Sequence, residues 1–154
     1  MRLPRTSLAV VASVLVVLAG CGSRKDPILA LVDDLEAAAE DKSADRIRDR
    51  LAEGFRGQGG IDRAEAYATL RRYFAAYETI DLEVYDVSVQ RGDGSADVRF
   101  RVEFSGHARS IGGLDGLLPP GAAYRFGLHL VEQGGAWKVD RADWETVAQP
   151  GPGG

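Results

Sequence analysis

The spacing of apolar residues predicts three helices between residues 26 and 78, and the first of them is amphipathic along its length. It begins at Asp26-Pro27, where an N-cap residue is followed by proline at the first helical position. Apolar residues then recur every three or four positions, with acidic residues between them. The apolar stripe is Ile28, Leu31, Val32, Leu35, Ala38 and Ala39, and the acidic side is Asp33, Asp34, Glu36 and Glu40.

The other two helices are predicted by their capping residues and by shorter apolar stripes. Ser43 is the expected N-cap of a second helix, which ends at Gly57-Gln58-Gly59-Gly60. The stripe of this helix is Ile47, Leu51 and Phe55. Asp62, followed three residues later by Glu65, is close to a capping box and predicts the start of a third helix. Its stripe is Tyr67, Leu70, Phe74 and Tyr77.

After Thr79 the apolar residues alternate, which predicts strands. The alternation slips at Tyr85, so the first strand should contain a β-bulge and bend there. A hairpin turn at 91–94 leads to a second strand at 96–104, and residues 105–121 are predicted to be irregular. Two more strands, at 124–131 and from 136 to about 144, surround a turn at 133–135.

Helices followed by an antiparallel meander with one polar face define an α+β domain, in which the helices must cover the apolar face of the sheet. We expect this domain to span residues 26–147, with a disordered tail at 148–154. The order of elements resembles the nuclear transport factor 2-like (SnoaL-like, cystatin-related) cone fold. Two segments carry the resemblance: the first helix, running through Ala37-Ala38-Ala39-Glu40-Asp41 into Ile47, Leu51 and Phe55, and the closing Gly135-Ala136-Trp137-Lys138-Val139. The resemblance implies three helices packed on a curved antiparallel sheet around a pocket. Some members of this fold are enzymes and others are binding domains.

The N-terminal segment has the pattern of a secretory signal peptide. Arg2 and Arg5 precede an apolar run at residues 8–19, which is shorter than the roughly 20 residues that a spanning helix needs. The run ends in Leu18-Ala19-Gly20-Cys21, which resembles the lipobox of bacterial lipoproteins.

The lipobox resemblance implies that residues 1–20 are removed and that Cys21 receives a diacylglyceryl group and becomes the new N-terminus. Residues 21–25 would then be a short lipidated tether to a membrane. Cys21 is the only cysteine of the chain, so no disulfide competes for its thiol. Gly22 stands where an aspartate tends to retain Gram-negative lipoproteins at the inner membrane. We therefore expect a cell-envelope protein, anchored in the outer membrane and facing the periplasm if the host is Gram-negative.

The charge of the chain restricts its partners. The full sequence has a net charge of −4, and loss of the two arginines in the signal peptide makes it −6. Nucleic acid needs a basic surface, so it is excluded as a partner. An acidic domain also gains nothing from an anionic membrane surface, so the lipid must provide the anchoring.

Enzymes of this fold place acid–base residues on the inward face of the strands. Here only Tyr124 of the inward positions in the best strands can exchange a proton, and its ordinary pKa near 10 makes it a poor base. His107, in the predicted irregular segment, is the second catalytic candidate, because a pocket mouth could form there. No histidine and carboxylate cluster has the spacing of metal ligands, so neither a metal nor another cofactor is expected.

The aromatic residues suggest a binding site. Eight of them could line one cavity between the third helix and the sheet: Tyr67, Phe74, Tyr77, Phe100, Phe104, Tyr124, Phe126 and Trp137. Packed tightly they would only form a core, whereas packed loosely they would suit a small apolar or aromatic ligand.

Two surfaces are candidates for protein partners. The irregular segment carries the apolar residues Ile111, Leu114, Leu117 and Leu118, which would either contact a partner or close the end of the cone. The polar face of the sheet carries Arg99, Arg101, Arg125 and His129 and could form a homodimer. The sequence favours a non-catalytic, membrane-anchored domain that binds a protein or a small apolar ligand. The alternative is a lyase or isomerase acting on a hydrophobic small molecule.

Overall fold

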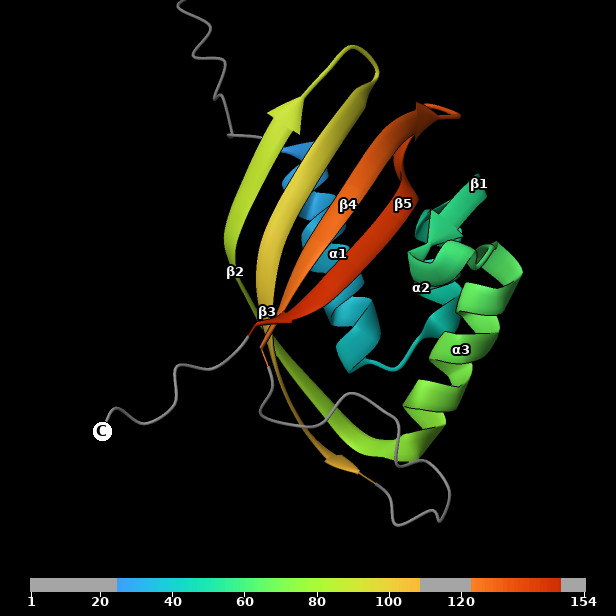
Figure 1. Cartoon of the computed structure of the whole chain (residues 1–154), viewed down its shortest axis with the longest axis vertical. Helices are drawn as coiled ribbons and strands as arrows, with labels where there is room; N and C mark the ends of the chain where they lie inside the picture. The colour runs from blue at the N-terminus through green and yellow to red at the C-terminus, as the bar shows by residue number, and fades with distance from the viewer. Residues whose placement is uncertain (1–24, 109–122, 148–154) are drawn as a thin grey trace, which may run out of the picture.

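A layer of helices lies against one face of a five-stranded sheet in the computed structural model of the chain (Figure 1). The structure describes residues 25–108 and 123–147. The elements are α1 (Pro27–Glu40), α2 (Ala44–Arg50), β1 (Leu51–Gly57), the 3-10 turn η1 (Gln58–Gly60), α3 (Arg63–Ala76), β2 (Tyr77–Arg91), β3 (Ser95–Ala108), β4 (Ala123–Gln133) and β5 (Ala136–Val147). The expected α+β class is confirmed. The signal peptide, Cys21, Ile111, Leu114, Leu117, Leu118 and the tail 148–154 lie outside the described residues.

The three predicted helix starts are confirmed by their caps. The Asp26 carboxylate accepts from the backbone N–H of Ile28 at 2.9 Å, and Pro27 is the first residue of α1. Ser43 Oγ accepts from the N–H of Arg46 at the start of α2. Asp62 and Glu65 form a reciprocal capping box, in which each side chain accepts from the other residue's backbone N–H. Within the described residues, no helix is long and apolar enough to span a bilayer.

The second helix was predicted to extend through Phe55, and that prediction is wrong. The helix α2 ends at Arg50, and Leu51 and Phe55 lie in the strand β1, which pairs in parallel with β5. Both side chains are still buried, because the strand delivers them to the same interior. Gly54 disfavours a helix here, because glycine inside a helix costs about 1 kcal/mol. The edge of β5 offers this backbone an alternative set of hydrogen bonds, so the segment forms a strand.

The sheet has the order β1-β5-β4-β3-β2, and every pair except β1–β5 is antiparallel. The predicted bulge in β2 is confirmed, because its register with β3 shifts between Tyr85 and Ser88 and Asp86 has a φ of 55°. The predicted hairpin turn is also confirmed, with Gly94 at a φ of 68°. These features bend β2 and β3 around the helices (Figure 1).

The strand β3 is longer than the sequence predicted. Residues 105–108 belong to it, although the segment from 105 was expected to be irregular. The long β2 begins directly after α3 and provides a partner for them, so that Thr79 pairs with His107. The two strands approach so closely that a Cβ on Gly106 would lie 2.5 Å from the Thr79 carbonyl oxygen. Glycine at 106 is therefore required by the pairing itself.

Asp34 joins α1 to α2 through two arginines. Its carboxylate accepts from Arg46 Nη2 at 2.9 Å and from Arg50 Nε at 2.7 Å. The hydrogen bond from Arg46, followed by that from Arg50, lowers the pKa of Asp34 below its ordinary 3.8. A lowered pKa in the folded state stabilises the fold above the unfolded pKa and is lost as the pH falls through the folded value.

We expect Asp34→Asn to lower the free energy of unfolding by about 1 kcal/mol at pH 7 and to flatten its decline in acid. Urea unfolding of the two proteins at pH 7 and at about pH 3 checks both effects. The matched control is Asp93→Asn, in the exposed hairpin turn, which should change neither. If the free energy of unfolding falls as steeply in acid for Asp34→Asn as for the wild type, Asp34 does not contribute to that fall.

Candidate functional site

A cavity of about 360 Å³ lies between the helices and the sheet. The helix α1 contributes one side of it, α3 another, and the inward faces of β2, β3, β4 and β5 form the floor. Its wall is almost wholly apolar and contains nine aromatic residues: Phe55, Tyr73, Phe74, Tyr77, Phe100, Phe104, Tyr124, Phe126 and Trp144. The interior is therefore not completely filled by side chains.

Most of the aromatic residues proposed from the sequence meet in this cavity. Phe74, Tyr77, Phe100, Phe104, Tyr124 and Phe126 all line it. Several are held in fixed ring contacts, which makes the wall a preformed surface. Phe100 and Phe126 stack with their centroids 5.5 Å apart, and Phe126 stacks in turn on Trp144 at 6.0 Å. The rings of Tyr77 and Phe104 meet edge to face, with their centroids 5.2 Å apart.

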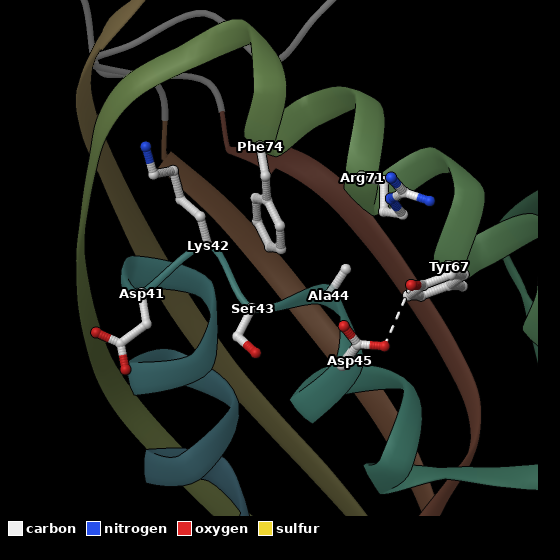
Figure 2. A pocket seen from close by; sticks show the side chains of 8 residues that line it. All are labelled: Asp41, Lys42, Ser43, Ala44, Asp45, Tyr67, Arg71 and Phe74. Carbon is white, nitrogen blue, oxygen red and sulfur yellow. Dashed lines mark hydrogen bonds between the residues drawn. The ribbon is translucent and has the colours of Figure 1, made fainter.

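Tyr67 and Trp137 were also predicted to line the cavity, and the structure places both elsewhere. Trp137 is half-buried and packs against the main apolar core. Tyr67 lies in a separate open groove between the α1–α2 turn and α3, shown in Figure 2. Its hydroxyl donates to Asp45 at 3.2 Å, and the guanidinium of Arg48 lies 4.7 Å from its ring centroid. About two helix turns beyond Tyr67, Phe74 lines both this groove and the cavity.

Tyr124 is the most buried of the polar residues in the cavity wall, with an exposed fraction of 2%. Its hydroxyl makes no hydrogen bond to any described residue, and its oxygen is not fully enclosed by protein atoms. Burial, followed by the neighbouring Tyr77 and Tyr73, raises the pKa of Tyr124 above its ordinary value of 10.0. Tyr124 is therefore a hydrogen-bond donor at neutral pH and an even poorer base than free tyrosine.

His107 does not join Tyr124 in the cavity. It lies on β3, not in an irregular loop at the pocket mouth as the sequence suggested, and its side chain is exposed. Its Nδ1 is 3.1 Å from the Thr79 hydroxyl on the paired strand. The two catalytic candidates are thus not brought together. No group of three metal-ligating side chains occurs in the parts of the chain that the structure describes.

The arginines proposed for a homodimer lie on the outer face of the sheet, and two of them form ion pairs within the chain. Arg101 Nε is 3.7 Å from Asp86, and Arg125 Nη1 is 2.5 Å from Glu145. Arg99 is exposed, and His129 is half-buried with Nδ1 3.4 Å from Asp140. Homodimerisation through this face stays a prediction.

Sequence reasoning missed Glu36, which it placed on the solvent side of the first helix. The structure places it in the cavity wall together with Val32, Leu35 and Ala39. These four positions follow the i, i+3, i+4, i+7 spacing of one helix face. That spacing was the signal that could have found it, because Glu36 interrupts an otherwise apolar stripe. Glu36 is half-buried and makes no ion pair or hydrogen bond with any residue in the ranges 25–108 and 123–147.

Comparison with solved structures identifies the fold. An uncharacterised protein with a cystatin-like fold from Caulobacter vibrioides superposes with a TM-score of 0.68 at 18% identity, over 80% of this chain and 89% of that one. A candidate dehydratase of the nuclear transport factor 2-like family from Streptomyces avermitilis superposes with a TM-score of 0.65 at 16% identity. The match covers 80% of this chain and 95% of that one. Bd1075 from Bdellovibrio bacteriovorus superposes with a TM-score of 0.64 at 13% identity. The match covers 78% of this chain but only 40% of Bd1075.

The chain therefore has the nuclear transport factor 2-like cone fold, as the resemblance in its sequence implied. No protein-family model matches the sequence, and no curated protein matches it either. The likeness is one of fold alone, and this fold serves both ligand-binding domains and enzymes. What this chain does must be argued from its own cavity.

Proposed function

We propose that this chain is a lipid-anchored protein of the cell envelope whose domain binds a small, largely apolar ligand inside the cone without transforming it. One observation carries the proposal: an aromatic cavity of about 360 Å³ is lined by Tyr124, whose hydroxyl has no hydrogen-bond partner among the described residues. Ligand sites are typically apolar, preformed cavities of about 300–1,000 Å³ with a few polar groups that orient the ligand.

The unpaired hydroxyl favours a ligand over an empty interior. A ligand that forms a hydrogen bond with the Tyr124 hydroxyl gains about 0.5–1.5 kcal/mol from it. The rings of Phe100 and Phe126, already stacked, need not reorganise when a flat molecule packs against them. Binding then loses little conformational entropy.

A specific observation keeps a lyase or isomerase as the second candidate. The dehydratase candidate from Streptomyces avermitilis shares the fold, and Glu36 places one carboxylate in the cavity wall. Such an enzyme would take its base from Glu36 and its acid from Tyr124, because His107 does not line the cavity. Turnover of a hydrophobic substrate that disappears in Glu36→Gln would replace the binding function with this one.

The anchor is proposed from the sequence of the N-terminal segment. The apolar run ending in Leu18-Ala19-Gly20-Cys21 supports lipidation at Cys21. Only four residues separate Cys21 from Asp26, the cap of α1, so the domain would sit close to the bilayer surface. An apolar ligand that partitions into lipid would be concentrated within reach of the cavity. We propose an outer-membrane position facing the periplasm in a Gram-negative host.

We expect the domain from residue 22 onward to bind N-phenyl-1-naphthylamine, an uncharged fluorescent probe with a single N–H group, in a saturable manner. Tyr124→Phe should weaken this binding about fivefold, because the Tyr124 oxygen accepts the hydrogen bond of the probe's N–H group and phenylalanine has no such acceptor. The same change should alter the free energy of unfolding of the ligand-free protein by less than about 0.5 kcal/mol, because the hydroxyl makes no hydrogen bond to a described residue.

Fluorescence titration and urea unfolding measure the two effects. The control is Tyr85→Phe, which removes a hydroxyl from a β2 residue that does not line the cavity and should leave binding unchanged. Absence of saturable binding to the wild type would overturn the proposed function. Equal binding by the wild type and Tyr124→Phe would show that Tyr124 does not contact the probe.

A further inference from the structure

The charge in the cavity wall is negative only. Among the described residues that line it there is one carboxylate, Glu36, and no lysine, arginine or histidine. The remaining polar groups are neutral: the tyrosine hydroxyls, Thr69 and the indole of Trp144. Burial raises the pKa of both Tyr77 and Tyr124, so neither adds a negative charge at neutral pH. An anionic ligand would therefore find nothing in this wall to compensate its charge.

Glu36 is available to a ligand because no residue that the structure describes forms an ion pair or hydrogen bond with its carboxylate. Neighbouring acidic residues on α1 are engaged elsewhere: Asp33 pairs with Lys25, Asp34 with Arg46 and Arg50, and Glu40 accepts from the N–H of Leu82. Glu36 alone of the acidic residues in α1 has no such partner and lies on the stripe that faces the cavity. A carboxylate placed beside apolar surface without a counter-ion favours a cation.

The aromatic rings add a second attraction for positive charge. The face of an aromatic ring is electronegative, and cages of such rings bind ammonium groups that carry alkyl substituents. The cavity surrounds its occupant with rings from α3, β2, β3, β4 and β5, among them Tyr73, Phe100 and Phe126. A carboxylate near a set of rings satisfies both the charge and the apolar surface of an alkylated ammonium group. The net charge of −6 that remains without residues 1–20 also attracts cations at long range.

We propose that the ligand of the cavity is an organic cation, with an alkylated ammonium group placed near Glu36 and an apolar or aromatic body packed against the rings. This inference rests on the proposed binding function and specifies the chemistry of its ligand. Glu36 supplies the charge, the rings of the wall enclose the alkyl groups, and Tyr124 donates to any acceptor on the body.

Three compounds of similar size test the charge preference directly. Benzyltrimethylammonium is the cation, neopentylbenzene is its uncharged carbon isostere, and benzenesulfonate is an anion. Each is titrated into the domain from residue 22 onward while NMR follows the indole N–H signals of Trp144, in the cavity wall, and of Trp137, outside it. We expect the Trp144 signal alone to shift, and the cation to bind about tenfold more tightly than its isostere. The anion should not bind.

The matched variants are Glu36→Gln and Glu83→Gln. The first removes the charge from the wall. It should weaken binding of the cation about fivefold and leave the affinity for the isostere unchanged. The second removes the same charge from the outer face of the sheet, where Glu83 is exposed opposite Glu103, and should change neither compound. Equal affinities for cation and isostere, or a loss that is the same in both variants, would overturn the charge preference and leave the binding function standing. If none of the compounds and no uncharged probe binds, the proposed function itself is wrong.

Discussion

Replacing Cys21 with serine is expected to abolish lipidation completely. The lipid is attached to the thiol, and Cys21 is the only cysteine in the chain, so no other residue can accept it. In a host that processes lipoproteins, the wild type should incorporate labelled palmitate and lose residues 1–20. Cys21→Ser should incorporate none and keep its leader, because the peptidase of this pathway cuts before a lipidated cysteine. Mass spectrometry of the purified protein measures both the added lipid and the missing leader.

Ser23→Ala is the matched control, since it changes a hydroxyl in the same tether without touching the cysteine. It should be labelled and cleaved like the wild type. The wild type should also stay with the membrane at high salt, because two or more acyl chains anchor stably whereas one is marginal. A wild-type protein that lacks palmitate and begins at a residue other than Cys21 would contradict the lipobox interpretation.

Local patterns predicted the elements whose ends are fixed locally. Asp26 and Asp62 cap helices through hydrogen bonds to residues two or three positions away, so sequence alone contains the information. The strand β3 could also be recognised, because its alternation places Val98 inside and Asp97 outside. The strand β1 could not. Leu51 and Phe55 have helical spacing, and what makes them a strand is the edge of β5, more than eighty residues away.

The site was predictable in part for the same reason. An inward aromatic on a strand is identified by its parity, and Phe100, Phe104, Tyr124 and Phe126 all reach the cavity. A helix presents a wider apolar stripe, so the residues at its borders depend on how the helix is rotated against the sheet. Tyr67 and Glu36 occupy such borders, and the packing turned the first away from the cavity and the second into it.

Whether the aromatic residues enclose a cavity or a solid core depends on distances that no residue pattern contains. The structure has both. One end of the interior is closed around fully buried residues such as Ile28, Val98 and Leu130, and the space remains where Tyr124 and Phe126 face α3. The sheet is curved along β2 and β3 (Figure 1), and the register of this pair shifts between Tyr85 and Ser88. The proposed binding function depends on this remaining space.

Filling the cavity is therefore expected to abolish ligand binding while the protein stays folded. Ala142 lies on the inward face of β5, opposite Leu128, and lines the cavity. In Ala142→Phe a phenyl ring would occupy volume that a ligand needs, so saturation by N-phenyl-1-naphthylamine should disappear. Because the ring enters existing space, the free energy of unfolding should change by less than about 1.5 kcal/mol. Fluorescence titration and urea unfolding on the same samples separate the two quantities.

Two further variants make the result specific to the cavity. Ala142→Leu fills less of the space, so it should weaken binding of the probe without eliminating it. Ala75→Phe introduces the same ring at an exposed position of α3 outside the cavity wall, and it should bind the probe as the wild type does. If Ala142→Phe folds with wild-type stability and still binds the probe with wild-type affinity, the probe binds elsewhere on the molecule. The functional role argued for Tyr124 and Glu36 would then fail with it, because both side chains act only on a molecule inside this space.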